Sequence, residues 1–291
     1  RKGGSELDMY YVAPMCTPTR VGLLTGRYWS RFGNTKPSNE RVLPWDIITL
    51  PKALKEVGYQ TSIAGKWHLG DPDWYPTKQG FTENRGGCDY GQPPSYFDPY
   101  TKPKGKHESL REGIYKLPGR KPGEFLTHRE ADETLSLIRQ WKDEPFFIQL
   151  GNYAVHTPIQ AIPEVAAKYQ KEGKTPIQAK YAALVESVDD AVGGILNLLE
   201  ELELDEKTLV IFTSDNGGLD RDGSPTDNAP HRSGQASAYE GGIRAPFLAR
   251  CHSAPVRLSS EGEAPPRGLR RCVDTPRGVR ARTPGSGMRR A

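Results

Sequence analysis

The alternation of apolar and polar residues along this chain of 291 residues predicts both helices and strands. The longest helical pattern covers about 179–202, where apolar side chains recur every three or four residues and form one stripe. A shorter helix with the same spacing is expected at about 129–141. A third helix is expected over 50–57, with Thr49 as its N-cap and Pro51 in its first turn.

Three short apolar runs, at 59–64, 146–150 and 208–213, predict β-strands. The run at 146–150 is nearly all apolar, which is typical of a strand buried in a parallel sheet. Because strands and helices alternate, we expect an α/β fold with a mixed or parallel sheet flanked by helices. Residues 71–124 are rich in Pro, Gly and aromatic residues with weak periodicity, so we expect long surface loops there.

Polar residues suited to chemistry follow each predicted strand. Lys66 and His68 follow the first strand, His156 the second, and Asp215 and Asn216 the third. Ligand sites in such sheets lie beyond the carboxyl ends of the strands, so we expect these side chains to lie close together. Taken singly they are weak indicators: an isolated His is commonly a surface residue, and Asp-Asn-Gly suits either an Asx turn or a hard cation.

The segment Cys16-Thr17-Pro18-Thr19-Arg20 places a small, potentially nucleophilic side chain just before a helical run. Pro18 is tolerated in a first helical turn because its missing N–H would have no partner there. Arg20 comes one turn later, on the same side as Cys16. A group at position 16 would therefore lie in the positive field of a helix N-terminus, which suits an anion. A lone buried cysteine would instead be a small apolar residue.

Charge is unevenly distributed along the chain. Residues 251–291 contain nine Arg, no Lys and three acidic residues, a net charge of +6, which leaves −2 for residues 1–250 of a chain with net charge +4. The basic character thus belongs to the tail, and we expect no nucleic-acid partner for the body. The four cysteines have no metal-type spacing and are too few for a disulfide framework. We also expect no membrane span, since no apolar run is long enough.

The composition of the tail, 251–291, differs abruptly from the body. It is rich in Arg, Pro and Gly and lacks Lys, aromatic residues and any helical or strand period. We expect it to be disordered. The alternative is an out-of-frame or mis-joined end, which sequencing of the gene through the junction would distinguish.

Several segments together resemble the sulfatase family, in family order over about residues 5–250. They are Cys16-x-Pro-x-Arg20 followed by Leu23-Leu24-Thr25-Gly26, Gly58-Tyr-Gln-Thr with Gly65-Lys66-Trp67-His68, His156-Thr-Pro158, Asp215-Asn216-Gly217, and Glu240-Gly-Gly-Ile-Arg244-Ala-Pro246. The resemblance implies a formylglycine-dependent, arylsulfatase-like enzyme of the alkaline phosphatase superfamily. It also implies a catalytic domain over 1–250 that lacks the first strand and the C-terminal subdomain, so we expect a fragment.

The resemblance assigns roles in the hydrolysis of a sulfate monoester. Cys16 would be oxidised to formylglycine by a formylglycine-generating enzyme, and the hydrate would attack sulfur, with Arg20 beside it. Lys66 would contact both the sulfate and the hydrate. His68 would deprotonate the second hydroxyl of the hydrate to expel sulfate. His156 would bind sulfate or protonate the leaving group. Splitting the reaction in this way avoids a direct attack of water on the shielded sulfur.

The resemblance also implies one calcium ion, held by Cys16 as formylglycine together with Asp215 and Asn216. Calcium takes about six to eight oxygen ligands, which these residues cannot supply alone. The family's other carboxylates are a pair of Asp after the first strand, upstream of the cysteine motif. We therefore expect an incomplete metal site in this chain.

The glycine-rich segment departs from the family at one position. Gln235 stands where the family usually has a sulfate-binding Lys, and Gln can donate a hydrogen bond but brings no charge. We expect weakened turnover from this change, because an aimed donor to a developing anion is worth about 3–4 kcal/mol. Glu240 and Arg244 are expected to hold the loop by an ion pair.

Other functions compete with a sulfatase that acts on a small sulfate ester or a sulfated carbohydrate. A phosphatase or phosphodiesterase of the same fold would use Ser or Thr and two metals, whereas the chain has Cys16 and no second metal set. An inert fragment or pseudoenzyme is favoured by the missing carboxylates, Gln235 and the tail. A nucleic-acid-binding module rests on the tail alone. The resemblance implies a periplasmic, secreted or lysosome-like location.

Overall fold

The computed structural model describes residues 4–36, 42–101, 114, 117, 119–221 and 223–251. Its strands are β1 (Gly4–Glu6), β2 (Gln60–Gly65), β3 (Glu83–Arg85), β4 (Phe146–Gly151), β5 (Val210–Thr213) and β6 (Phe247–Arg250). Its α-helices are α1 (Cys16–Thr25), α2 (Leu50–Glu56), α3 (Leu126–Gln140), α4 (Pro163–Lys171), α5 (Pro176–Glu201) and α6 (Glu240–Ile243). Three short 3₁₀ helices are η1 (Trp29–Phe32), η2 (Pro72–Trp74) and η3 (Pro76–Gln79).

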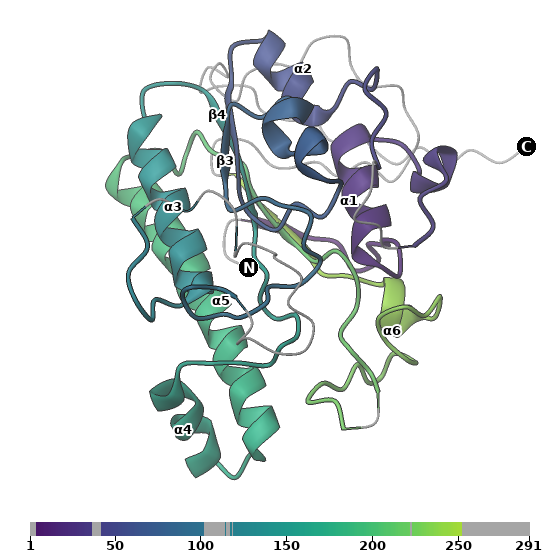
Figure 1. Cartoon of the computed structure of the whole chain (residues 1–291), viewed down its shortest axis with the longest axis vertical. Coiled ribbons are helices and arrows are strands. Elements are labelled where there is room, and N and C mark those ends of the chain that lie inside the picture. Colours follow the sequence, from purple (N-terminus) through teal and green to yellow (C-terminus); the bar gives the residue numbers. More distant parts are fainter. Residues whose placement is uncertain are drawn as a thin grey trace, which may run out of the picture.

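The strands form two three-stranded sheets. In the order β3-β2-β4 all neighbours are parallel, with Ser62 opposite Ile148, whereas β1-β6-β5 is antiparallel, with Phe212 opposite Leu248. Helices α3 and α5 lie on one side of the strands, and α1 and α2 lie on the other (Figure 1). The α/β class and the flanking helices predicted from the sequence are therefore confirmed.

The longest helix begins earlier than its apolar stripe predicts. Thr175 is the N-cap of α5: its side chain accepts a hydrogen bond from the Gln178 N–H, and the Gln178 side chain accepts one from the Thr175 N–H, forming a capping box. At the other end of the stripe, Leu198 and Leu199 are buried against Ile138 of α3. The helix pair α3–α5 thus forms an apolar platform beneath the strands.

The N-cap predicted for α2 is confirmed. The Thr49 side chain accepts a hydrogen bond from the Lys52 N–H at 3.4 Å. The same hydroxyl donates to the Gln79 carbonyl at 2.7 Å, which connects the start of α2 to η3. The helix ends at Glu56, one residue before the predicted end.

The prediction of surface loops over 71–124 is wrong for much of the part that the structure describes. Trp74, Phe81 and Tyr96 are buried. The Phe81 ring packs edge-on against Trp67 and stacked against Phe147, with centroid distances of 6.0 and 6.1 Å. The segment lacks periodicity because its aromatic residues fill the core from irregular backbone, so their burial leaves no pattern in the sequence.

The predictions for the tail lie outside the described residues except at Cys251, which is buried. Among the described residues, no disulfide bond joins Cys16, Cys88 and Cys251. Within the described residues no helix is both long and apolar enough to cross a membrane.

Candidate active site

The cysteine turn forms the start of α1. Cys16 is the first residue of that helix and is only 4% exposed. Within the turn, the Ala13 N–H donates to Thr19 Oγ1 at 3.0 Å, which holds the segment before the helix against its first turn. The side chain at position 16 is therefore fixed at the N-terminus of α1, where the partial positive charge of the helix is greatest.

The end of β2 brings Lys66 and His68 to the same place. Gly65 has a φ of +88°, and a Cβ there would collide with the Gly151 carbonyl, so only glycine suits the strand end. The Lys66 N–H donates to that carbonyl at 2.6 Å, and the His68 N–H donates to the Cys88 carbonyl at 3.0 Å. Backbone bonds thus fix both residues after the strand.

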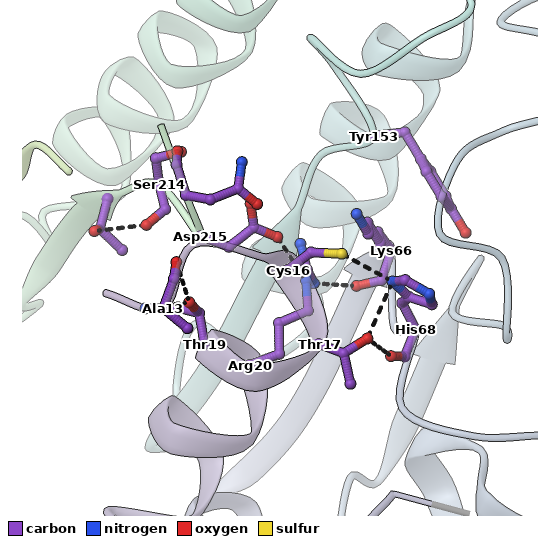
Figure 2. Close-up of polar contacts among 12 residues, drawn as sticks. Ala13, Cys16, Thr17, Thr19, Arg20, Lys66, His68, Tyr153, Ser214 and Asp215 are labelled. Carbon is purple, nitrogen blue, oxygen red and sulfur yellow. Dashed lines mark hydrogen bonds and ion pairs between the residues drawn. The ribbon is translucent and has the colours of Figure 1, made fainter. Parts of the chain in front are cut away.

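Cys16, Lys66 and His68 converge on one buried point, as Figure 2 shows. Cys16 Sγ lies 3.2 Å from His68 Nδ1, and Lys66 is 3% exposed. Burial, followed by the positive charge of Arg20, lowers the pKa of Lys66. Burial, followed by the positive charge of Lys66, lowers the pKa of His68 to about 3. At neutral pH this imidazole is uncharged and can accept a proton.

Arg20 binds two other site residues. Its Nη1 donates to the Lys66 carbonyl at 2.7 Å, and its Nε donates to Asp215 Oδ2 at 2.9 Å (Figure 2). Burial acts to raise the pKa of Asp215, but the charges of Arg20 and Lys66 outweigh it, and the pKa is lowered. The guanidinium therefore positions the Lys66 backbone relative to a carboxylate 195 residues away in sequence.

His156 follows β4 and belongs to the same electrostatic cluster. Burial, followed by the positive charge of Lys66, lowers its pKa. Its Nδ1 lies 3.1 Å from the Thr157 carbonyl, and Tyr96 Oη donates to the His156 carbonyl at 2.9 Å. The structure thus brings together the polar residues that follow all three predicted strands.

Asp215 and Asn216 supply oxygen atoms suited to a hard cation. Asn216 Oδ1 is buried and has no hydrogen-bond partner among the described residues, while its Nδ2 donates to the Gly217 carbonyl at 2.9 Å. Within the same part of the chain, no group of three or more His, Cys, Asp or Glu side chains could hold a metal. Because calcium takes about six to eight oxygens, these residues fit only part of a calcium shell.

Gln235 lies on a loop that joins the cysteine turn to the loop after β5. Its N–H donates to the Gly218 carbonyl, and the Ala236 N–H donates to the Pro14 carbonyl, both at 2.8 Å. The Gln235 side chain is half-buried. The main chain around Gln235 is therefore held beside the site.

The ion pair predicted for the glycine-rich segment is confirmed. Arg244 Nη1 lies 3.4 Å from Glu240 Oε2, and Arg244 Nε donates to the Asp8 carbonyl at 2.9 Å. Tyr11 Oη also donates to Glu240 at 2.9 Å. These contacts connect the segment before β6 to the chain that leads into the cysteine turn.

Sequence reasoning missed two residues that surround His68. Thr17 Oγ1 donates to the His68 carbonyl at 3.3 Å and lies 3.5 Å from Nδ1. Gly91 lies against the ring, since a Cβ there would be 2.6 Å from Cε1. The place of Thr17 within the cysteine motif could have indicated its role, whereas nothing in the sequence indicates the contact of Gly91.

Comparisons with known proteins agree with this geometry. The sulfatase family model matches residues 1–261. Human N-acetylgalactosamine-6-sulfatase is 33% identical over 271 residues, covering 83% of this chain and 49% of the relative. The N-acetylgalactosamine-6-O-sulfatase of Bacteroides thetaiotaomicron is 30% identical over 318 residues, covering 86% and 60%. The chain thus spans about half the length of the first of these relatives and less than two thirds of the second.

Solved structures show the same fold. Ps i-CgsB in complex with k-i-k-neocarrahexaose has a TM-score of 0.72 and 33% identity, with 86% of this chain and 58% of that chain covered. The alkaline-phosphatase-like α/β fold implied by the sequence motifs is therefore confirmed. The family model thus matches most of this chain, and the cysteine turn, Lys66, His68 and His156 lie at one site. The chain therefore belongs to the sulfatase family of sulfuric ester hydrolases.

Proposed function

We propose that this chain carries the catalytic centre of a sulfatase that cleaves sulfate monoesters by means of a formylglycine made from Cys16. The observation that carries the proposal is the 3.2 Å separation of Cys16 Sγ and His68 Nδ1, with Lys66 buried in the same cluster. An oxygen in place of this sulfur would lie within proton-transfer distance of the imidazole.

The neighbouring side chains have distinct roles in this proposal. Formylglycine at position 16 supplies an oxygen nucleophile for sulfur. Lys66 binds a sulfate oxygen and offsets its charge. His68, whose pKa is about 3, accepts a proton from the group at position 16. The negative charge of a bound ester raises the pKa of His156 toward the protonated form, which can then donate to the leaving oxygen.

Arg20 holds two parts of the catalytic centre in place. Its bonds to the Lys66 carbonyl and to Asp215 fix the ammonium-bearing segment relative to the carboxylate. Gln235 would add a neutral donor to the sulfate site. Thr17, bonded to the His68 carbonyl, restrains the backbone of the base.

Asp215 and Asn216 would hold calcium, with the buried Asn216 Oδ1 as the ligand that has no other partner among the described residues. A bound calcium ion would offset negative charge on the sulfate. Calorimetric titration with calcium tests this role: binding that is lost in Asp215→Asn supports it. Absence of binding by the intact chain favours the alternative, an inert sulfatase fragment.

We propose a sulfated carbohydrate as the substrate class. Two relatives are named for N-acetylgalactosamine-6-sulfate, and one similar structure contains k-i-k-neocarrahexaose. A formylglycine-generating enzyme would be the maturation partner. A periplasmic, secreted or lysosome-like location remains a prediction.

The first experiment is mass spectrometry of the peptide that contains Cys16, after co-expression with a formylglycine-generating enzyme. We expect the mass of the aldehyde at position 16 and hydrolysis of p-nitrophenyl sulfate, with neither in Cys16→Ala. A thiol that persists beside a working converting enzyme contradicts the proposal. Hydrolysis of p-nitrophenyl phosphate instead of the sulfate would favour a phosphatase of the same fold.

A further inference from the structure

One buried acid lies beside the candidate site, and none of the proposed catalytic steps uses it. Glu130 of α3 has 0% of its surface exposed. Neither of its carboxyl oxygens has a hydrogen-bond partner among the described residues. A carboxylate in such a place would be strongly destabilised, so a buried acid without partners keeps its proton. This carboxyl is therefore uncharged in the folded chain.

The Glu130 carboxyl lies against the end of β2. Helix α3 packs against β2 and β4 (Figure 1). A Cβ at Gly65, the last residue of β2, would lie 2.8 Å from Glu130 Oε1 and 3.0 Å from Cδ. The missing side chain of Gly65 therefore leaves the space that the carboxyl fills. Lys66 is the next residue, so the acid supports the strand end from which this lysine projects.

Arg20 connects this acid to the catalytic centre. Its Nη1 donates to the Lys66 carbonyl at 2.7 Å, one residue beyond the glycine that contacts Glu130. Burial raises the pKa of Glu130 well above its ordinary value. The Tyr153 main-chain N–H, which does not reach hydrogen-bond geometry, and the charge of Arg20 act in the opposite direction on this pKa but are outweighed. The proton on Glu130 thus leaves Arg20 bonded to the Lys66 carbonyl.

The basic side chains nearest to Glu130 in sequence face other acids. Arg129 Nε donates to Glu133 at 3.0 Å, and its Nη1 donates to Glu124 at 3.1 Å. His128 Nε2 lies 3.9 Å from Asp190 of α5, the helix that packs against α3. These contacts of α3 and α5 therefore do not neutralise a charge on Glu130.

Other groups face the carboxyl from the remaining elements packed against it. They are Arg20 of α1, Tyr153 after β4 and Tyr96 in the segment before α3. Burial, followed by the charge that Glu130 would carry, raises the pKa of Tyr96, and burial also raises the pKa of Tyr153. Both phenols are therefore uncharged at neutral pH. Arg20 is thus the cation that an ionised Glu130 would attract.

We propose that Glu130 is a positioning residue for Lys66 and Arg20 that works only while its carboxyl carries a proton. The uncharged acid fills the space at Gly65 and leaves Arg20 bonded to the Lys66 carbonyl. When hydroxide removes the proton, the carboxylate attracts the guanidinium away from that carbonyl, and Lys66 loses its support. The catalytic consequence rests on the proposed sulfatase function, whereas the bound proton does not.

Infrared spectroscopy tests the proton directly. At neutral pH the folded chain should show the C=O stretch of an un-ionised carboxyl, and Glu130→Gln should lack this band. Exposed acids are ionised at neutral pH, because their pKa is about 4, so the band reports a buried acid. Glu206→Gln, at an exposed glutamate, is the matched control and should keep the band. If Glu130→Gln does not fold, ¹³C spectra of the glutamate-labelled parent report the same proton, as a carboxyl resonance that stays at its acid position at neutral pH.

Urea unfolding measures the same proton through its effect on stability. Above the ordinary pKa of a glutamate, the unfolded chain releases a proton that the folded chain retains, so stability falls as the pH rises. Relative to Glu130→Gln, the unfolding constant of the parent should rise about tenfold per pH unit between about pH 5 and pH 7. Glu206→Gln should follow the parent at every pH.

Turnover of p-nitrophenyl sulfate by aldehyde-bearing enzyme tests the positioning role. Glu130→Ala removes the carboxyl from Gly65 and should lower kcat by about 100-fold, with a much smaller change in KM. Glu130→Gln, which is neutral and of the same shape, should recover most of this loss. At alkaline pH the parent should lose kcat as Glu130 ionises, and Glu130→Gln should extend activity to higher pH. A residue that only stabilised the fold would not move this pH profile.

Three results would overturn the proposal. An infrared spectrum without a band that depends on Glu130 would show that the acid is ionised. An equal pH dependence of stability in the parent and Glu130→Gln would show the same. A Glu130→Gln variant as slow as Glu130→Ala would show that the negative charge is needed. Absence of turnover in the aldehyde-bearing parent would instead contradict the proposed function, while the band and the pH-dependent stability would still support the protonated carboxyl.

Discussion

Gly91 packs against the ring of His68, the candidate base, so Gly91→Ala tests the geometry of the site. A Cβ at this position would lie 2.6 Å from His68 Cε1 and 2.8 Å from Nε2. Ordinary contact begins at 3.4 Å, so the ring would have to move by about 0.8 Å. His68 is 4% exposed and therefore has little room to move. Its Nδ1, now 3.2 Å from Cys16 Sγ, would be displaced from the nucleophile.

Two magnitudes follow from this displacement. Overpacking a buried contact costs about 1–3 kcal/mol, which urea unfolding would measure as a lower free energy of unfolding. A misplacement of about 1 Å costs about 100-fold in rate, which the turnover of p-nitrophenyl sulfate by aldehyde-bearing enzyme would measure. Cross-peaks of the His68 imidazole in ¹⁵N spectra report the ring movement without any need for activity.

Gly193→Ala is the matched control for this change. Gly193 lies inside α5, and an added Cβ would meet no heavy atom within 4 Å. The same substitution should therefore stabilise the chain by up to about 1 kcal/mol through helix propensity. If Gly91→Ala kept the parent stability, rate and His68 spectrum while Gly193→Ala showed its gain, the contact assigned to Gly91 would be refuted.

Three further changes probe other parts of the site. Gln235→Lys in aldehyde-bearing enzyme should raise kcat/KM about tenfold or more, because an aimed cationic donor stabilises a developing anion; an unchanged rate would contradict a sulfate-binding role for this position. Arg20→Lys replaces the guanidinium that bonds both the Lys66 carbonyl and Asp215, and it should lower the free energy of unfolding by about 1–3 kcal/mol in urea titration. A urea midpoint equal to that of the parent would contradict this role of Arg20. Ala236→Gly should stabilise the chain by about 1 kcal/mol, because Ala236 has a φ of 72°; a loss of thermal stability would show that its methyl group matters more than its backbone.

The sequence predicts those elements that carry their own periodicity. The stripe of α5, the N-cap of α2 and the apolar run of β4 are local features, and they place these elements to within a few residues. By contrast, β1 and β6 are three and four residues long and depend on pairing with each other across most of the chain. Strands this short have too few alternating positions to be recognised before their partner is known.

The candidate site, like the fold, is predicted by the sequence only in part. The positions of Lys66, His68 and His156 follow from strand ends, because the parallel strands β2 and β4 direct their carboxyl ends to one edge. Asp215 also follows a strand end, but β5 belongs to the antiparallel sheet. What the sequence cannot show is which polar groups pair across that edge. Motif spacing predicts that Arg20 lies near Cys16, but not that its guanidinium bonds a backbone carbonyl and a carboxylate at once. Those two acceptors follow strands of different sheets, β2 and β5, so only the complete fold brings them together.

This bridging role makes Arg20 sensitive to how the two sheets are joined. Its Nη1 bonds Lys66, which follows the parallel sheet, while its Nε bonds Asp215, which follows β5 of the antiparallel sheet. One side chain therefore joins residues that follow strands of both sheets. The position of Asp215, and with it that of the neighbouring Asn216 Oδ1, depends on this guanidinium. Arg20→Lys should accordingly weaken calcium binding in calorimetric titration, because a less preorganised ligand pair loses more conformational entropy on binding; an unchanged affinity would contradict this dependence.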